Sequence, residues 1–301
     1  MNFIAIILVL ASCVTHAGWN LVSKSKTPSA AFFALSTSSS VLVMTPLYLF
    51  SLPYLSRISP VVWGLLIVTG FFQALYFISL GNSYRLNDIS LAYPISRSLP
   101  VLMVPLVCFI IGYGKPLSIL AIVGMIITAA GCMILPLKVI NASVLKHYFQ
   151  YSFLFVLLAA VGTTGYSIID SMGLELLRTG AHPLSTMQAA SFYVAFEDLM
   201  TVLFLWPYVK FSRQEKINLR IIGKRSLRYP LLAGPVVAIT YWLVLMAMQF
   251  ATNVSYIVTF RQVSILIGVL LGIFVLKEKS TPFKITGTAL IFAGLVLAAI
   301  G

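Results

Sequence analysis

Long apolar runs without a single charged side chain dominate this sequence; residues 27–56, 58–84 and 229–260 are three of them. A helix of about 20 apolar residues crosses the hydrocarbon core of a membrane, so each run is long enough to span it. Charged residues make up 9% of the chain, whereas a soluble protein carries about a quarter. The sequence therefore predicts an integral membrane protein and excludes a soluble enzyme.

Clusters of charged residues, proline and glycine divide the chain into ten predicted spans. These cover residues 2–22, 29–51, 60–81, 89–111, 117–137, 149–170, 186–208, 230–251, 254–276 and 283–300. Most connectors are short, so neighbouring helices are expected to be antiparallel. The predicted fold class is all-α, a multi-pass protein of a bacterial inner membrane. Membrane lipid is an expected partner. Nucleic acid is not, although the net charge is +13, because the charges lie between the apolar runs.

The distribution of lysine and arginine predicts the orientation, because cytoplasmic connectors carry an excess of these residues. The odd-numbered connectors hold fifteen of the 20 and the even-numbered connectors hold three, Arg57, Lys115 and Arg178. The odd connectors are therefore expected in the cytoplasm. With ten spans, both termini then face outward.

Residues of the fourth and fifth spans recur in the ninth and tenth, which indicates an internal repeat. The segment Asp88-Ile89-Ser90 and the later Arg97 match Asn253-Val254-Ser255 and Arg261. Gly124 and Gly131 match Gly287 and Gly294, which are expected at close helix contacts, including those of a homodimer. Two five-helix halves are predicted, residues 1–137 and 149–301. Because five is odd, the second half is inverted, as in many secondary transporters.

Two sequence segments resemble the drug/metabolite transporter superfamily of the EamA type. They are His16-Ala17-Gly18-Trp19-Asn20 and the run from Asp88 to Arg97; Tyr166 with Asp170, and Leu276-Lys277-Glu278, are similar to its second-half signatures. The resemblance covers essentially the whole chain and implies a ten-helix transporter, without fixing the substrate. One departure is that Gly112-Tyr113-Gly114-Lys115 lacks the acidic residue usual in that connector.

Arg97 and Arg261 lie within predicted spans, where an ionisable side chain must face protein or water. They are expected to bind an anionic group of the substrate in a central cavity. The alternative is a structural role, in which they pair with Glu197, Asp198 or Asp170. Pro94, Pro100 and Pro105 surround Arg97, and prolines interrupt helices. The span 89–111 is therefore predicted to be broken.

Glu197 and Asp198 are adjacent acidic residues within one span. Neighbours on a helix point about 100° apart, so the two carboxyl groups are expected to face different surroundings. One hypothesis is that either group couples transport to protons. The other is that they balance the arginines or lie near a bend.

Further polar and aromatic side chains are expected to line the substrate cavity, although packing explains each one singly. They are His16, Trp19, Asn20, Tyr76, Tyr93, Tyr166, Asp170, Trp242, Gln249 and Gln262.

The sequence contains no HExxH, GxSxG or Walker motif. Neither a catalytic residue nor a metal or cofactor site is therefore expected. The prediction is a secondary transporter that moves a small polar metabolite with an anionic group, such as an amino-acid-like compound. The alternatives are a flippase for a lipid-linked or amphiphilic substrate and an uptake carrier for organophosphonates or phosphate esters. A receptor or assembly subunit would require a soluble domain, which the sequence does not indicate.

Overall fold

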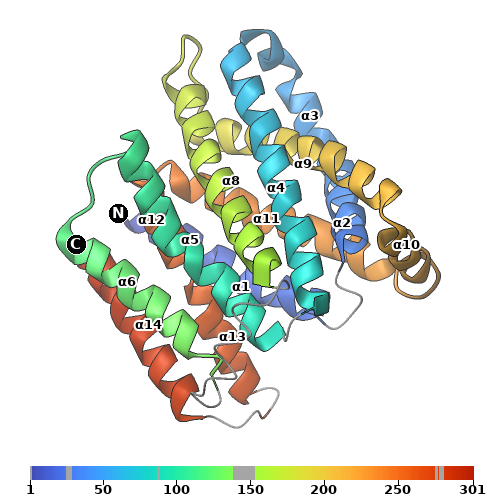
Figure 1. Ribbon diagram of the computed structural model, residues 1–301. Coiled ribbons are helices and arrows are strands. Elements are labelled where there is room, and N and C mark those ends of the chain that lie inside the picture. Colours follow the sequence, from blue (N-terminus) through green and yellow to red (C-terminus); the bar gives the residue numbers. More distant parts are fainter. Residues whose placement is uncertain (1, 25–28, 87–88, 138–152, 275–276, 278–280) are drawn as a thin grey trace.

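Helices account for nearly all of the described chain (Figure 1). The computed structural model describes residues 2–24, 29–86, 89–137, 153–274, 277 and 281–301, with residues 17–24 and 89–93 described by their backbone alone. The first half contains α1 (Phe3–Lys24), α2 (Ala30–Val43), α3 (Thr45–Ser51), the 3-10 helix η1 (Leu52–Arg57), α4 (Pro60–Leu86), α5 (Ile89–Ile111) and α6 (Ile119–Ile134). The second contains α8 (Phe153–Thr179), α9 (Thr186–Phe211), α10 (Arg213–Arg225), α11 (Arg228–Met248), α12 (Val254–Phe260), α13 (Val263–Phe274) and α14 (Pro282–Ile300).

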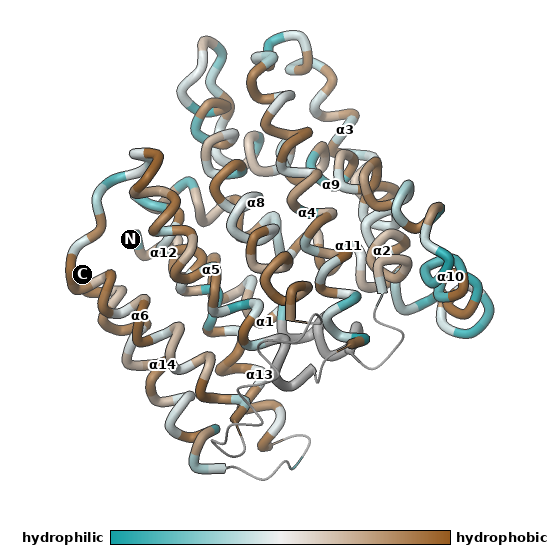
Figure 2. Tube along the Cα trace, in the orientation of Figure 1, coloured by the Kyte–Doolittle hydropathy of each residue, from teal (hydrophilic) through white to brown (hydrophobic). Residues whose placement is uncertain are grey.

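Seven helices within the described part of the chain are long and apolar enough to cross a membrane, or eight if the bent pair α2–α3 forms one span. Residues 3–16 of α1 and helix α6 are apolar but shorter. Figure 2 shows hydrophobic residues along most helices and hydrophilic ones gathered on α10. The chain is thus an all-α, multi-pass membrane protein. The count of ten spans stays a prediction.

The break predicted for the fourth span is absent, although a proline, Pro46, does lie at the bend between α2 and α3. Helix α5 runs without interruption through Pro94, Pro100 and Pro105, so the predicted break in residues 89–111 is wrong. The prolines are more than one turn apart, and each removes only one bond from the helical ladder. The break lies instead at Arg261 and Gln262, between α12 and α13.

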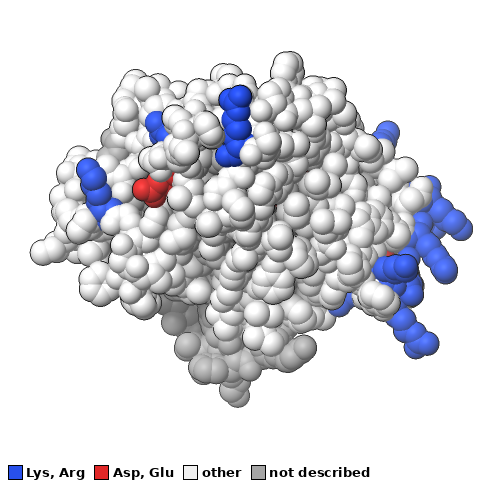
Figure 3. All heavy atoms as spheres, turned by 90° about the horizontal axis from the view of Figure 1, so that it is seen from above, with Lys and Arg blue, Asp and Glu red and all other residues white. Residues whose placement is uncertain are grey.

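Helices from the two halves of the chain pack on each other. Helix α4 contacts α8 and α9, while α11 contacts α1 and α2. The pair α2 and α9 also meet, as do α6 and α14. In the view of Figure 3, lysine and arginine side chains crowd at one side, over α10, and most of the remaining surface carries neither acidic nor basic residues.

Glycines allow several of these helices to approach closely. A Cβ atom built on Gly124 would lie 2.6 Å from the Gly294 carbonyl oxygen, and one on Gly131 would lie 2.8 Å from that of Gly287. All four glycines therefore lie at the contact between α6 and α14 within one chain. Small residues at such positions are typical of helix contacts in membranes.

Two glycines of α4 provide a matched test of this packing. A Cβ atom on Gly70 would lie 2.8 Å from the Met200 backbone carbon on α9, whereas one on Gly64 would meet nothing within 4 Å. We expect Gly70→Ala to lower the free energy of unfolding by about 1–3 kcal/mol, because the helices must separate. Gly64→Ala is expected to be neutral. Thermal unfolding of the purified variants measures both. Equal stability of the two variants would contradict this packing.

Candidate functional site

The guanidinium group of Arg97 binds protein atoms of α1 and of the region around the break between α12 and α13 through Nη1 and Nη2, while its Nε has no partner among the described residues. It donates to the backbone carbonyl of Arg261 at 3.1 Å and to Ser264 Oγ at 3.1 Å. A third contact joins Nη1 to His16 Nε2 at 3.1 Å. Since a guanidinium group can only donate, the imidazole nitrogen is the acceptor. Arg97 thus connects α5 to α1 and to the break between α12 and α13.

The helix break supplies an acceptor for Arg97. At the break the Ile265 amide donates to Gln262 at 2.9 Å instead of to Arg261. The Arg261 carbonyl instead accepts from the Ser264 amide at 3.2 Å, from the Ser264 hydroxyl at 2.8 Å and from Arg97. Arg97 adds a charged donor to these two neutral ones, and charge-assisted hydrogen bonds are the stronger kind, so Arg97 stabilises the irregular backbone at this place.

The side chain of Arg261 lies among tyrosine rings. Its Nη2 donates to Tyr166 OH at 3.4 Å, and its Cζ lies 6.0 Å from the Tyr166 ring centre and 5.6 Å from that of Tyr241. Arg261 is 7% exposed, and its Nη1 has no hydrogen-bond partner among the residues that the structure describes. This buried cation therefore keeps a free donor.

Three tyrosines form a continuous aromatic wall. The rings of Tyr76 and Tyr166 have centres 5.9 Å apart, and those of Tyr166 and Tyr241 have centres 5.6 Å apart, both edge to face. They come from α4, α8 and α11. The wall therefore joins helices of both halves beside Arg261, and rings of this kind attract a cation.

The intramembrane acidic residues accept hydrogen bonds from neutral side chains. Asp170 binds the hydroxyls of Thr69 and Tyr241, and Glu197 accepts from Gln73 Nε2 at 2.5 Å. Thr69 and Gln73 are one turn apart on α4. Both carboxyl groups are fully buried, and Glu197 Oε2 has no partner within the described part of the chain.

Asp198 points elsewhere, toward the Ser40 hydroxyl on α2, and is only partly buried. Glu197 and Asp198 therefore face different helices, which confirms that prediction. Among the described residues, neither Arg97 nor Arg261 forms an ion pair with Asp170, Glu197 or Asp198. Within the described part of the chain, the permanent ion pairs that the alternative requires are therefore absent.

A double-mutant cycle tests this separation. If Arg97 and Glu197 balanced each other, Arg97→Gln combined with Glu197→Gln would restore stability. Because no contact joins them, we expect the two losses in the free energy of unfolding to add within about 0.5 kcal/mol. Chemical denaturation of the four proteins measures this. A coupling energy above about 1 kcal/mol would contradict the geometry.

Most of the other predicted residues lie near this centre. His16, Tyr76, Tyr166 and Asp170 take part as described, and Gln262 is buried next to Arg261, with Nε2 donating to the Val258 carbonyl at 3.0 Å. Trp242 lies on α11 next to Tyr241 and donates to Ser191 Oγ at 3.1 Å. The side chains of Trp19, Asn20 and Tyr93 lie outside the described residues.

Gln249 lies apart from the centre, at the end of α11. Its Nε2 donates to the Thr186 carbonyl at 3.1 Å, and it lines an open pocket of about 730 Å³ together with Tyr113, Lys115, Glu175 and Arg178. Tyr113 OH donates to Glu175 at 3.0 Å, and burial raises the pKa of Tyr113 above its ordinary value. Gln249 thus lines this pocket and does not contact the Arg261 side chain, and its predicted role in substrate binding stays a prediction. Glu175 supplies an acidic side chain beside the connector that lacks one.

Sequence analysis does not identify several of the central residues. They are Thr69, Gln73, Tyr241 and Ser264. The spacing of Thr69 and Gln73 is a usable signal, since two polar residues four apart share one face of a helix. Ser264 carries no such signal, because single serines are frequent in membrane helices.

Comparison with known proteins gives the fold alone. No protein-family model matches the chain, and no curated protein matches it. One solved structure, described only as "Crystal structure of protein", is similar over 98% of this chain and 97% of that chain. The TM-score is 0.62 and the sequence identity is 15%, so the likeness extends over the whole fold but carries no function.

Proposed function

We propose that this chain is a secondary transporter of the drug/metabolite type. It moves a small polar metabolite with a carboxylate, phosphonate or phosphate group across the membrane by alternating access. Its ten spans form two inverted five-helix repeats, and the substrate binds between them at Arg261.

The pairing of helices supports the two repeats. If each helix is replaced by the helix five spans away, one observed pair of contacting helices becomes another observed pair. The contact of α1 with α11 becomes that of α8 with α4, and the contact of α2 with α11 becomes that of α9 with α4. Helix α5 packs on α8 as α12 and α13 pack on α1. The pairs α2–α9 and α6–α14 are converted into themselves.

Close contacts between residues follow the same rule. Gly70 packs against Met200, and its counterpart Gly234 packs against Ser36. Gly70 and Gly234 are 164 positions apart, as are Ser36 and Met200, and this is the separation of Arg97 and Arg261. One offset therefore relates independent contacts in both halves, which supports an ancestral duplication.

The observation that carries the proposal is the free Nη1 donor of a buried guanidinium group at the contact of the two halves. A guanidinium group offers paired donors that fit carboxylate and phosphate groups. Arg261 lacks an acidic partner among the described residues, so an anionic substrate would satisfy both its charge and its free donor. The tyrosine wall adds apolar surface for the rest of a small ligand.

A ligand screen tests this proposal. Purified protein is tested for thermal stabilisation by amino acids, dicarboxylates, phosphonates, phosphate esters and choline. We expect stabilisation only by compounds with an anionic group, because they bind the folded state. Stabilisation by choline alone would exclude an anion site.

Proton coupling, where it occurs, is expected through Glu197 and not through Asp198. Glu197 is buried with an unpartnered oxygen, and its electrostatic neighbours are Asp170, Asp198 and Arg261. Glu197→Gln removes the proton site without changing the shape, so the pH dependence of transport should flatten. Asp198→Asn is the matched control and should retain it. Uptake by proteoliposomes between pH 5 and 8 tests this assignment. A flat pH profile only in Asp198→Asn would reverse it.

A further inference from the structure

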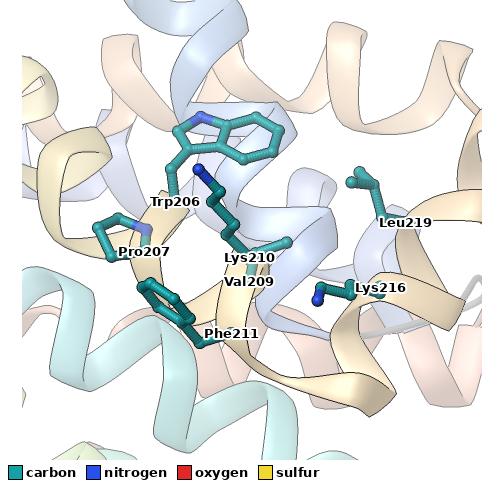
Figure 4. Close-up of a pocket in the computed structure, with 7 residues that line it drawn as sticks. All are labelled: Trp206, Pro207, Val209, Lys210, Phe211, Lys216 and Leu219. Carbon is teal, nitrogen blue, oxygen red and sulfur yellow. The ribbon is translucent and has the colours of Figure 1, made fainter.

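The junction of α9 and α10 contains a hollow of about 560 Å³ on the outside of the bundle. Apolar side chains line it, among them Trp206, Phe211 and Leu219, and two lysines, Lys210 and Lys216, stand at its rim. Figure 4 shows the Lys210 side chain beside the Trp206 indole, with Lys216 across from it on α10. The hollow thus combines apolar walls with two cations.

The hollow lies at the end of a membrane span, near the boundary of the membrane. Helix α9 is one of the candidate spans and ends at Phe211, which is 80% exposed. Its last turns therefore lie where acyl chains meet headgroups, a depth at which tryptophan and lysine are typical. The Trp206 indole nitrogen donates to Ser38 Oγ on α2 at 2.9 Å, which fixes the ring against the hollow.

Helix α10 is held by its inner face and presents cations on its outer face. Buried Glu215 accepts from the Ala31 amide at the start of α2 at 2.8 Å and from Asn218 at 3.1 Å. At 100° per residue, the opposite face carries a stripe of basic residues, Arg213, Lys216, Arg220 and Lys224. The one acidic residue of α10 thus lies on the inner face, away from the rim lysines.

Beside this basic stripe, α10 also exposes Ile217 and Ile221, at 51% and 41%. A helix with cations and apolar residues on its outer surface is typical of binding at a membrane interface. Helix α10 therefore extends the apolar and cationic character of the hollow along the membrane surface.

We propose that the hollow binds one anionic phospholipid from the leaflet next to α10. An acyl chain packs against Trp206 and Phe211, and the phosphate group lies between Lys210 and Lys216. A zwitterionic lipid brings its own cation to the phosphate, so it gains less from the two lysines. Basic pockets at the cytoplasmic ends of membrane helices are known sites for anionic headgroups. The site rests on the membrane fold and not on transport.

Purified full-length protein with phosphatidylglycerol, phosphatidylcholine or inorganic phosphate tests the site. Native mass spectrometry counts the retained lipid, and thermal unfolding measures its effect. We expect one phosphatidylglycerol to be retained and to stabilise the protein more than phosphatidylcholine or inorganic phosphate does. Each rim lysine is worth about fivefold in affinity for an anionic lipid, so Lys210→Gln/Lys216→Gln should lose about 25-fold.

The control variant Lys115→Gln/Arg178→Gln also removes two cations, but around the pocket beside Gln249, and should retain the lipid. Leu219→Trp keeps both lysines and fills the hollow, so it should lose the lipid as well. Equal loss in the control would show general charge attraction, and equal stabilisation by phosphatidylcholine would show no anionic site. Stabilisation by inorganic phosphate to the same extent would show an anion site without lipid. Each of these three results would overturn the proposal.

Discussion

Arg261→Lys is expected to weaken binding of an anionic substrate by about ten- to a hundredfold while the protein stays folded. Lysine keeps the positive charge but loses the planar pair of donors that fits a carboxylate or phosphate group. A charge-assisted hydrogen bond in a buried site is worth about 1.5–3 kcal/mol, which corresponds to one to two decades of affinity. The free Nη1 of Arg261 is the donor that this substitution removes. Titration of the best compound from the ligand screen measures the change.

The matched control for Arg261→Lys is Arg178→Lys. Arg178 donates to the Gln249 carbonyl at 2.9 Å and is exposed, far from the tyrosine wall. This change should leave affinity within about twofold, because an exposed contact contributes little. Unchanged binding in Arg261→Lys, or an equal loss in both variants, would remove Arg261 from the site.

Arg97→Gln is expected to lower the free energy of unfolding by about 2–4 kcal/mol, a larger loss than that of Gly70→Ala. Its guanidinium group has three protein acceptors, on α1, at the break after α12 and on α13. Glutamine is too short to reach them, and a hydrogen bond to a charged group contributes about 1.5–3 kcal/mol. The break between α12 and α13 should loosen with it. Chemical denaturation of the variant measures the loss.

The two arginines are thus expected to differ, although sequence analysis treats them as an equivalent pair. Arg97→Gln should lower stability strongly, whereas Arg261→Gln should lower substrate affinity with a smaller effect on stability. A stable Arg97→Gln protein with lost binding would show instead that Arg97 contacts the substrate and that the bonds to Ser264 and to the Arg261 carbonyl are unimportant.

The sequence predicts the helices well because the cost of exposing polar groups to lipid sets their length. The predicted span 60–81 appears as α4 and the predicted span 186–208 as α9. Both helices are longer than predicted, ending at Leu86 and Phe211, because a helix continues where its residues can reach the headgroup region. The amphipathic helix α10 falls in a connector that sequence analysis leaves unassigned.

The helix breaks and the polar contacts could not be predicted in the same way. Residues 261 and 262 are neither proline nor glycine, and the break there exists together with a contact from Arg97, which is 164 residues away. Thr69 and Gln73, which donate to Asp170 and Glu197, likewise come from α4, in the other half of the chain. A hydrophobicity pattern reports which residues are apolar, but it carries no information on which distant side chains meet.

Accessibility of Ser167 tests the central claim without knowledge of the substrate. Ser167 is fully buried on α8 beside Tyr166, and none of the described residues forms a hydrogen bond with its hydroxyl. Ser167→Cys is made in a protein whose three native cysteines, Cys13, Cys108 and Cys132, are replaced by alanine. Membrane vesicles of both orientations are treated with thiol reagents that carry either a sulfonate or a trimethylammonium group, and the rates of modification are compared.

Alternating access predicts modification of Ser167→Cys from both sides of the membrane. Arg261 predicts that the sulfonate reagent reacts at least about tenfold faster than the trimethylammonium reagent, since an unpaired buried cation attracts anions. The preference should disappear when Arg261→Gln is added. Modification from one side only, or a faster reaction with the cationic reagent, would contradict a transporter with a central anion site.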